Sequence, residues 1–251
     1  MPRFAANLTW LFTELPLMER FAAAKEGGFS GVEILFPYDA PAQDMRDQLV
    51  IRGLDFVLLN CPPPNYTGGP RGFAAVPGSE DRFRRDFDRA LRYAGVLKPR
   101  HIHIMAGEAG GEAARAAFTE NLRWAAARAP AQSLTIEPIN RTDMPGYYLA
   151  DFDLAAAIIA DVAAPNLGLQ YDTWHAQAIH GDALAVWRRH RAIVRHVQVS
   201  GFPGRNEPGG PGFDFPAFFA ELDASGYDGW VSGEYRPATT TTAGLGWLPG
   251  R

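Results

Sequence analysis

Short apolar segments that alternate with longer helical stretches restrict the fold of this chain more than any other feature. This alternation is typical of α/β proteins whose strands run parallel. Eight strand-like runs cover residues 4–8, 31–35, 54–60, 101–105, 133–137, 167–172, 194–200 and 229–234. Helices are expected near 15–26, 41–52, 79–97, 113–128, 152–163, 182–190 and 215–225. Eight such units in 251 residues predict one (β/α)8 TIM-barrel domain over residues 1–251.

The later strands carry polar side chains on one face. Ser133, Thr135 and Glu137 alternate with apolar residues, and side chains two positions apart on a strand point the same way. The runs 167–172 and 194–200 alternate similarly. A parallel sheet covered on both faces would instead be continuously apolar. We therefore predict a barrel whose interior is polar near the carboxyl ends of its later strands.

Charge and cysteine content narrow the function. The chain has 24 Lys and Arg against 28 Asp and Glu, and this net charge of −4 disfavours a nucleic-acid partner or an anionic membrane. Cys61 is the single cysteine, which excludes an internal disulfide and a thiolate metal cluster. No apolar run approaches the roughly 20 residues that span a bilayer, and the start lacks a signal-peptide pattern. We expect a soluble cytoplasmic protein that acts on a small molecule. It could also form a homo-oligomer.

Four side chains with ligand oxygens stand at or near the ends of the last four predicted strands. They are Glu137, Asp172, Gln198 and Glu234, separated by the length of a strand and helix unit. These side chains should meet at the carboxyl end of the barrel, where TIM-barrel active sites lie. Three carboxylates in one place repel each other unless a cation neutralises them. Oxygen ligands favour Mg²⁺ or Mn²⁺ over structural zinc.

Longer motifs surround these four positions. They are Glu137-Pro138-Ile139-Asn140, Gln170-Tyr171-Asp172, His196-Val197-Gln198 and Gly233-Glu234-Tyr235-Arg236-Pro237, with further segments at 4–8, 29–38, 143–149 and 240–247. Together they resemble the hydroxypyruvate isomerase family of the xylose isomerase-like barrels, which includes 2-oxotetronate isomerases. The resemblance extends over nearly the whole chain.

The resemblance implies isomerisation of hydroxypyruvate to tartronate semialdehyde, or of a 2-oxotetronate. It implies that Glu137, Asp172, Gln198 and Glu234 bind the metal and that Glu137 and Glu234 are the acid/base pair. This assignment agrees with the chemistry, because moving a carbonyl by one carbon passes through an enediolate and requires two proton transfers. No organic cofactor is needed.

Three further residues are weaker candidates for substrate binding. His175 follows Asp172 by three positions, His103 lies near the rim on its strand, and Arg205 could present a guanidinium fork to a substrate carboxylate. The nearby segments Ser200-Gly201-Phe202 and Gly209-Gly210-Pro211-Gly212-Phe213 depart from the family pattern, which leaves the exact substrate open. The irregular stretch 61–79 is expected to be a lid or a subunit contact.

Three other functions stay open from the sequence. A sugar C3-epimerase would share the metal and the two glutamates, although such enzymes usually have His where Gln198 stands. A metal-dependent endonuclease would need more histidines and a basic surface. A non-catalytic sugar-acid binder would not need both glutamates. Metal-dependent turnover distinguishes the enzymes from the binder.

Overall fold

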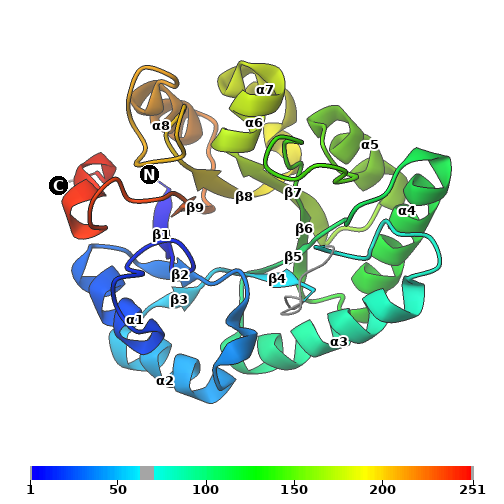
Figure 1. Cartoon of the computed structure of the whole chain (residues 1–251), viewed down its shortest axis with the longest axis horizontal. Coiled ribbons are helices and arrows are strands. Elements are labelled where there is room, and N and C mark those ends of the chain that lie inside the picture. Colours follow the sequence, from blue (N-terminus) through cyan, green and yellow to red (C-terminus); the bar gives the residue numbers. More distant parts are fainter. Residues whose placement is uncertain (1, 63–70, 250–251) are drawn as a thin grey trace.

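A nearly closed barrel of parallel strands, with helices around its outside, forms the molecule (Figure 1). The computed structural model describes residues 2–62 and 71–249, and nine strands lie within them. The strands are β1 (Arg3–Asn7), β2 (Gly31–Glu33), β3 (Asp55–Phe56), β4 (Leu58–Cys61), β5 (His101–Ile104), β6 (Ser133–Ile136), β7 (Leu167–Asp172), β8 (Val194–Val199) and β9 (Trp230–Gly233). Their order in the sheet is β3-β2-β1-β9-β8-β7-β6-β5-β4. The predicted TIM-barrel fold is confirmed.

The two ends of the sheet meet at Val57, between β3 and β4. Its N–H donates to Val32 of β2 at 2.7 Å, and its carbonyl accepts from His101 of β5 at 2.8 Å. The run 54–60, expected as one strand, is therefore divided into two short segments that pair first with β2 and then with β5. This division accounts for nine strands where eight were predicted.

The helices follow the strands in the order expected for βα units. They are α1 (Leu17–Glu26), α2 (Ala42–Arg52), α3 (Glu80–Leu97), α4 (Gly111–Arg128), α5 (Phe152–Val162), α6 (Thr173–His180), α7 (Ala183–His190) and α8 (Phe215–Ala224), with short 3₁₀ turns η1 (Pro37–Asp39), η2 (Arg191–Ile193) and η3 (Thr242–Trp247). The sequence did not predict α6. It begins directly after β7, and Asp172 caps it by accepting the N–H of Trp174 at 2.9 Å.

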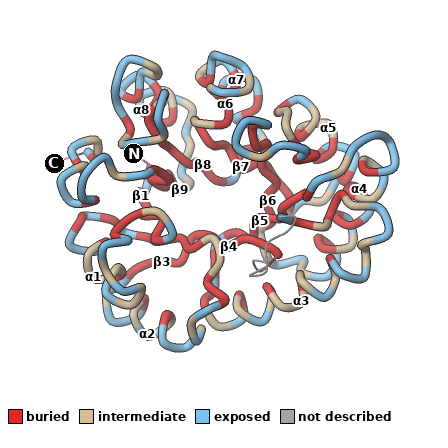
Figure 2. Tube along the Cα trace, in the orientation of Figure 1, coloured by how far each residue is buried: buried red, intermediate tan, exposed pale blue. Residues whose placement is uncertain are grey.

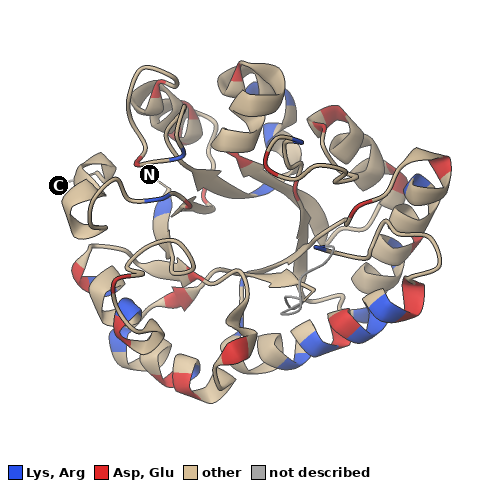
Figure 3. Ribbon diagram, in the orientation of Figure 1, with Lys and Arg blue, Asp and Glu red and all other residues tan. Residues whose placement is uncertain are grey.

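Apolar helix faces cover the outside of the barrel. On α3, Phe83, Phe87, Ala90 and Ala94 recur at helical spacing and are buried, as Figure 2 shows for the inner sides of the helices in general. Charged residues of both signs occupy the outer surface of α3 (Figure 3). Among the described residues no helix combines the length and the apolar character needed to cross a membrane.

The bottom of the barrel is filled by Trp230 of β9. It packs with Ala5, Val57 and Leu58 in a small buried cluster, and the guanidinium carbon of Arg3 lies 4.5 Å from its ring centroid. Above this cluster the inward side chains become polar. The barrel thus has a closed apolar base and a polar upper interior, as the alternation predicted.

Gly31 of β2 lets the Trp230 ring enter the barrel. A Cβ at this position would lie 2.7 Å from the ring, inside van der Waals contact. We expect Gly31→Ala to lower the free energy of unfolding by about 1–3 kcal/mol, because overpacking forces shifts in a filled core. Urea unfolding followed by circular dichroism measures this change.

Gly95→Ala is the matched control. Gly95 lies in α3 with open space around its Cβ position, so the change should be neutral or stabilising by about 0.4–1 kcal/mol. Equal stabilities for both variants would show that the ring does not need this close approach.

Candidate active site

A cavity of about 400 Å³ opens at the carboxyl ends of the strands. Glu137 follows β6 directly, Asp172 ends β7 and Glu234 follows β9. Glu137 and Glu234 line the cavity, and all three carboxylates are buried. The structure therefore brings the predicted acidic residues to one end of the barrel, because parallel strands end at the same edge.

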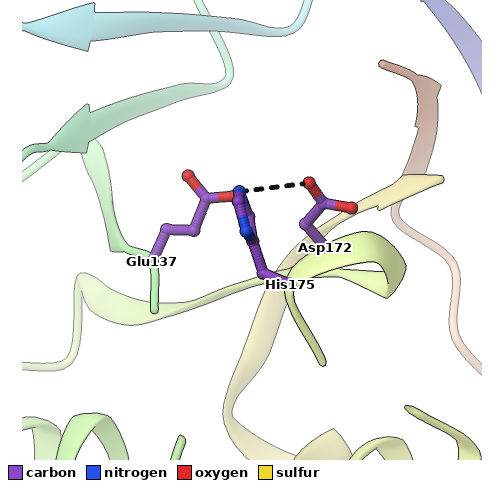
Figure 4. Close-up of side chains that lie close together, drawn as sticks. All are labelled: Glu137, Asp172 and His175. Carbon is purple, nitrogen blue, oxygen red and sulfur yellow. Dashed lines mark ion pairs between the residues drawn. The ribbon is translucent and has the colours of Figure 1, made fainter. Parts of the chain in front are cut away.

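Glu137, Asp172 and His175 form a buried group that could hold a metal ion (Figure 4). One candidate ligand atom from each lies within 4.8 Å of the others. In Figure 4 the three side chains point toward one another, His175 from α6 and the carboxylates from the ends of their strands. The Nε2 of His175 is 3.7 Å from Oδ2 of Asp172.

The hydrogen bonds of His175 determine which nitrogen carries its proton. Nδ1 lies 3.3 Å from the backbone N–H of Asn140 and 2.9 Å from its side-chain amide nitrogen, and both are donors. The Asn140 side-chain oxygen already accepts the N–H groups of Thr142 and Asp143, so the amide orientation is fixed. Nδ1 is therefore an acceptor, and the proton of the neutral ring is on Nε2. This proton lies 3.7 Å from Oδ2 of Asp172 when measured from Nε2, beyond hydrogen-bond distance, and the carboxylates are the ligand atoms that remain.

Arg205 lies between the carboxylates. Its guanidinium donates to Asp172 at 3.1 Å and to Glu234 at 2.8 Å, with Asp143 at 3.5 Å. Trp10 packs against the same guanidinium, whose carbon is 5.1 Å from the ring centroid. The sequence predicted this guanidinium for a substrate carboxylate, whereas here two of the protein's own carboxylates accept hydrogen bonds from its Nη2.

Gln198 presents its amide nitrogen, rather than its oxygen, to Glu234. The nitrogen donates to Glu234 and to Glu33, the latter at 2.7 Å, while the oxygen accepts from Gln170 at 2.7 Å. Turning the amide over would bring its oxygen against two carboxylates. The structure thus gives Gln198 a donor's orientation toward both carboxylates, and its role as a metal ligand stays a prediction.

Glu33 lies at the centre of a buried network below the cavity. It accepts hydrogen bonds from Asn7 at 2.8 Å and Gln198, and it lies 2.8 Å from Nε2 of His196. Asn7 also donates to Glu234 at 3.1 Å. Glu33 and His196 were not among the site residues predicted from the sequence. Their inward positions were the available signal.

Burial alters the protonation of the site. It raises the pKa of Glu234 to about 8 and that of Asp172 to about 6, with the opposite charge of Arg205 limiting both changes. Burial and the neighbouring Glu234 raise the pKa of Glu137 well above its ordinary value. Burial lowers the pKa of His103 to about 3. The site therefore holds carboxyl groups that retain protons near neutral pH, beside neutral imidazoles.

Comparisons with known proteins identify the class. The chain matches the model of the xylose isomerase-like TIM barrel family over residues 21–250 and belongs to this family. It is 46% identical to the 2-oxo-tetronate isomerase of Cupriavidus necator (99% of this chain, 98% of the relative) and 37% identical to the hydroxypyruvate isomerase of Escherichia coli with the same coverage. A crystal structure titled AP endonuclease, family 2, from Brucella melitensis superposes with a TM-score of 0.95 at 41% identity, covering 98% of each chain.

These relatives confirm the resemblance seen in the sequence. The chain is an enzyme of the isomerase type, and its curated relatives include isomerases of small oxo acids.

The raised carboxyl pKa values make the metal-free protein sensitive to pH. Above about pH 6.5, where histidines are neutral in both states, the folded state keeps the Glu234 proton up to about pH 8 while the unfolded chain has lost it, so stability should fall as pH rises. Below that pH the lowered pKa of the buried His103 acts in the opposite direction. We therefore expect the melting temperature of chelator-treated protein to fall between pH 7 and pH 8. Added Mn²⁺ should raise it more at pH 8, where metal binding costs fewer protons.

Glu234→Gln is the matched variant for this experiment. It removes one titrating carboxyl group, so its melting temperature should depend less on pH. A wild-type melting temperature that is constant over this range would contradict the raised pKa.

Proposed function

We propose that this enzyme isomerises a small 2-oxo hydroxy acid, such as hydroxypyruvate or a 2-oxotetronate, with a divalent cation. The names of its relatives support the substrate class. The observation that carries the proposal is that Glu137 and Glu234, two buried carboxyl groups with raised pKa values, line one cavity from β6 and β9. These strands are separated by β7 and β8 in the barrel wall, so the two groups approach a substrate from different sides.

The two glutamates perform the proton transfers. Moving the carbonyl to the neighbouring carbon requires removal of a proton from one carbon and delivery of a proton to the other, with an enediolate between. A general base works best when its pKa lies near the working pH, and burial raises that of Glu234 to about 8 in the metal-free protein, a value that a bound cation would lower. One glutamate accepts the first proton and the other donates the second.

The donor set fits a hard divalent cation such as Mg²⁺ or Mn²⁺. Glu137 and Asp172 belong to the group whose ligand atoms converge, Glu234 offers a further carboxyl group from the lining of the same cavity, and Arg205 supplies one positive charge against them. Gln198 could add its oxygen only after its amide turned over. When bound, the cation would supply positive charge beside the substrate oxygens, where negative charge develops.

The two imidazoles of the cavity suit substrate hydroxyl groups. His103 donates from Nδ1 to the Asn60 side-chain oxygen at 3.2 Å, so its Nε2 is an acceptor. This Nε2 is buried and has no hydrogen-bond partner among the described residues. A substrate hydroxyl that donates to His103 would satisfy it, while the protonated Nε2 of His175 can donate to a substrate oxygen.

Incubation in D₂O tests the reaction. Hydroxypyruvate, 2-oxotetronates and ketoses are incubated with protein and Mg²⁺ or Mn²⁺ and followed by NMR. We expect isomerisation of an oxo acid with deuterium at the carbon that receives a proton, loss of activity with a chelator, and recovery with the cation. Turnover of ketoses alone would support the sugar C3-epimerase alternative, and full activity without metal would contradict the cation's role.

Substitution of each glutamate tests the proton carriers. Glu137→Gln and Glu234→Gln keep the size of the side chain but remove the base, and each should lower kcat on the order of 10² to 10⁴. If each glutamate serves one carbon, the two variants should lose exchange at different carbons in D₂O. Wild-type turnover by either variant would move the proton transfer to another group.

A further inference from the structure

Three arginines line the cavity: Arg71, Arg205 and Arg236. An oxo-acid substrate brings a carboxylate into a space that already holds buried acidic groups, so it needs a cationic partner there. Arg205 donates from Nη2 to Asp172 and Glu234 and lies close to Asp143, so its charge is already matched by carboxylates of the site, although its Nε has no hydrogen-bond partner among the described residues. Among the described residues, Arg71 and Arg236 form no ion pair.

The position of Arg236 is well defined by its surroundings. Its backbone N–H donates a hydrogen bond to the Arg205 carbonyl at 2.8 Å, and its backbone carbonyl accepts one from the Asn206 side-chain amide at 2.9 Å. Its guanidinium carbon lies 5.2 Å from the centroid of the Trp10 ring. The backbone is thus anchored to the loop after β8, and an aromatic ring supports the charged end, which leaves the N–H donors available to a ligand.

Arg236 also follows Glu234 by two residues. A substrate carboxylate held by this guanidinium would therefore be fixed relative to one of the proposed proton carriers by a short piece of chain. Arg71 has no comparable anchor among the described residues, since no hydrogen bond of its side chain and no aromatic contact is found there. These differences favour Arg236.

We propose that Arg236 binds the substrate carboxylate and thereby selects acids over neutral sugars. This inference rests on the proposed function, because it assigns the group that recognises the acid end of that substrate. A guanidinium matches a carboxylate with two parallel N–H donors, and the Trp10 ring lies beside this one while the residue itself is exposed at the mouth of the cavity.

The test compares Arg236→Gln and Arg236→Lys with wild type. Kinetics with the oxo acid that wild type converts give kcat and KM. Calorimetry with Mg²⁺ present gives the affinity for glycerate, a hydroxy acid without a carbonyl, and for glycerol, which has no carboxylate. Arg92→Gln is the matched control, because Arg92 is exposed on α3 and does not line the cavity.

We expect Arg236→Gln to raise KM for the oxo acid and Kd for glycerate by roughly 10- to 100-fold, as for loss of a charge-assisted hydrogen bond. The kcat should change by less than about threefold, because the glutamates are retained. Arg236→Lys should give an intermediate KM, since it keeps the charge without the fork. Glycerol binding and the Arg92→Gln variant should resemble wild type.

Three results would overturn the assignment. The first is wild-type glycerate affinity in Arg236→Gln. The second is a loss of glycerate affinity confined to Arg71→Gln or Arg205→Gln, which would locate the carboxylate there. The third is a fall in kcat at constant KM, which would indicate that Arg236 only supports Glu234.

The calorimetric measurement of glycerate affinity separates this proposal from the proposed function. If wild type converts no oxo acid but glycerate binding still depends on Arg236, the reaction is wrong and the anion site stands. If wild type converts an oxo acid and Arg236→Gln leaves KM and glycerate affinity unchanged, the reaction stands and the anion site is wrong. Melting temperatures of the Gln and Lys variants identify any effect that arises from misfolding.

Discussion

Burial of four carboxyl groups in one barrel is the constraint on which the site depends. A buried charge is costly unless it is paired or hydrogen bonded. Glu33 accepts hydrogen bonds from the side chains of Asn7, Gln198 and His196. Arg205 forms ion pairs with both Asp172 and Glu234. Glu137 has the neutral His103 as its nearest basic neighbour, at 3.7 Å. The charge of the site is thus least balanced near Glu137, beside Asp172, where the ligand atoms converge.

Gln198 connects the lower network to the catalytic rim. Its side-chain nitrogen donates hydrogen bonds to both Glu33 and Glu234, and its oxygen accepts one from the side-chain nitrogen of Gln170. The side-chain oxygen of Gln170 in turn accepts a hydrogen bond from the Thr135 hydroxyl at 3.1 Å. This chain of polar contacts crosses the barrel at the level where an ordinary TIM barrel packs branched aliphatic side chains. These polar side chains replace some of the apolar packing of an ordinary barrel, and their hydrogen bonds fix the orientation of Glu234. The same residues therefore serve the fold and the proposed chemistry.

The sequence predicted the elements better than the contacts between them. Alternation placed β7 at its observed bounds, and strand-end positions identified Glu137, Asp172 and Glu234. The helix α6 was missed because Asp172 both ends a strand and caps the helix, which removes the loop that usually marks a boundary. The partners of Arg205 were also missed, because a loop residue's direction depends on tertiary packing that periodicity does not encode. The orientation of the Gln198 amide likewise follows from Glu33, a residue far away in the sequence.

The two segments that depart from the family pattern fit each other in space. A Cβ at Gly212 would collide with the backbone of Phe202, and one at Gly201 would collide with the Glu207 carbonyl, so both glycines permit a tight loop. The Phe202 ring packs on Trp174 at 5.1 Å between centroids, and Trp174 lines the cavity. Because this loop also carries Arg205 and anchors the backbone of Arg236, the departures act together on the part of the site that would contact the substrate. They can therefore change which acid is accepted while the carboxylates at the strand ends stay in place.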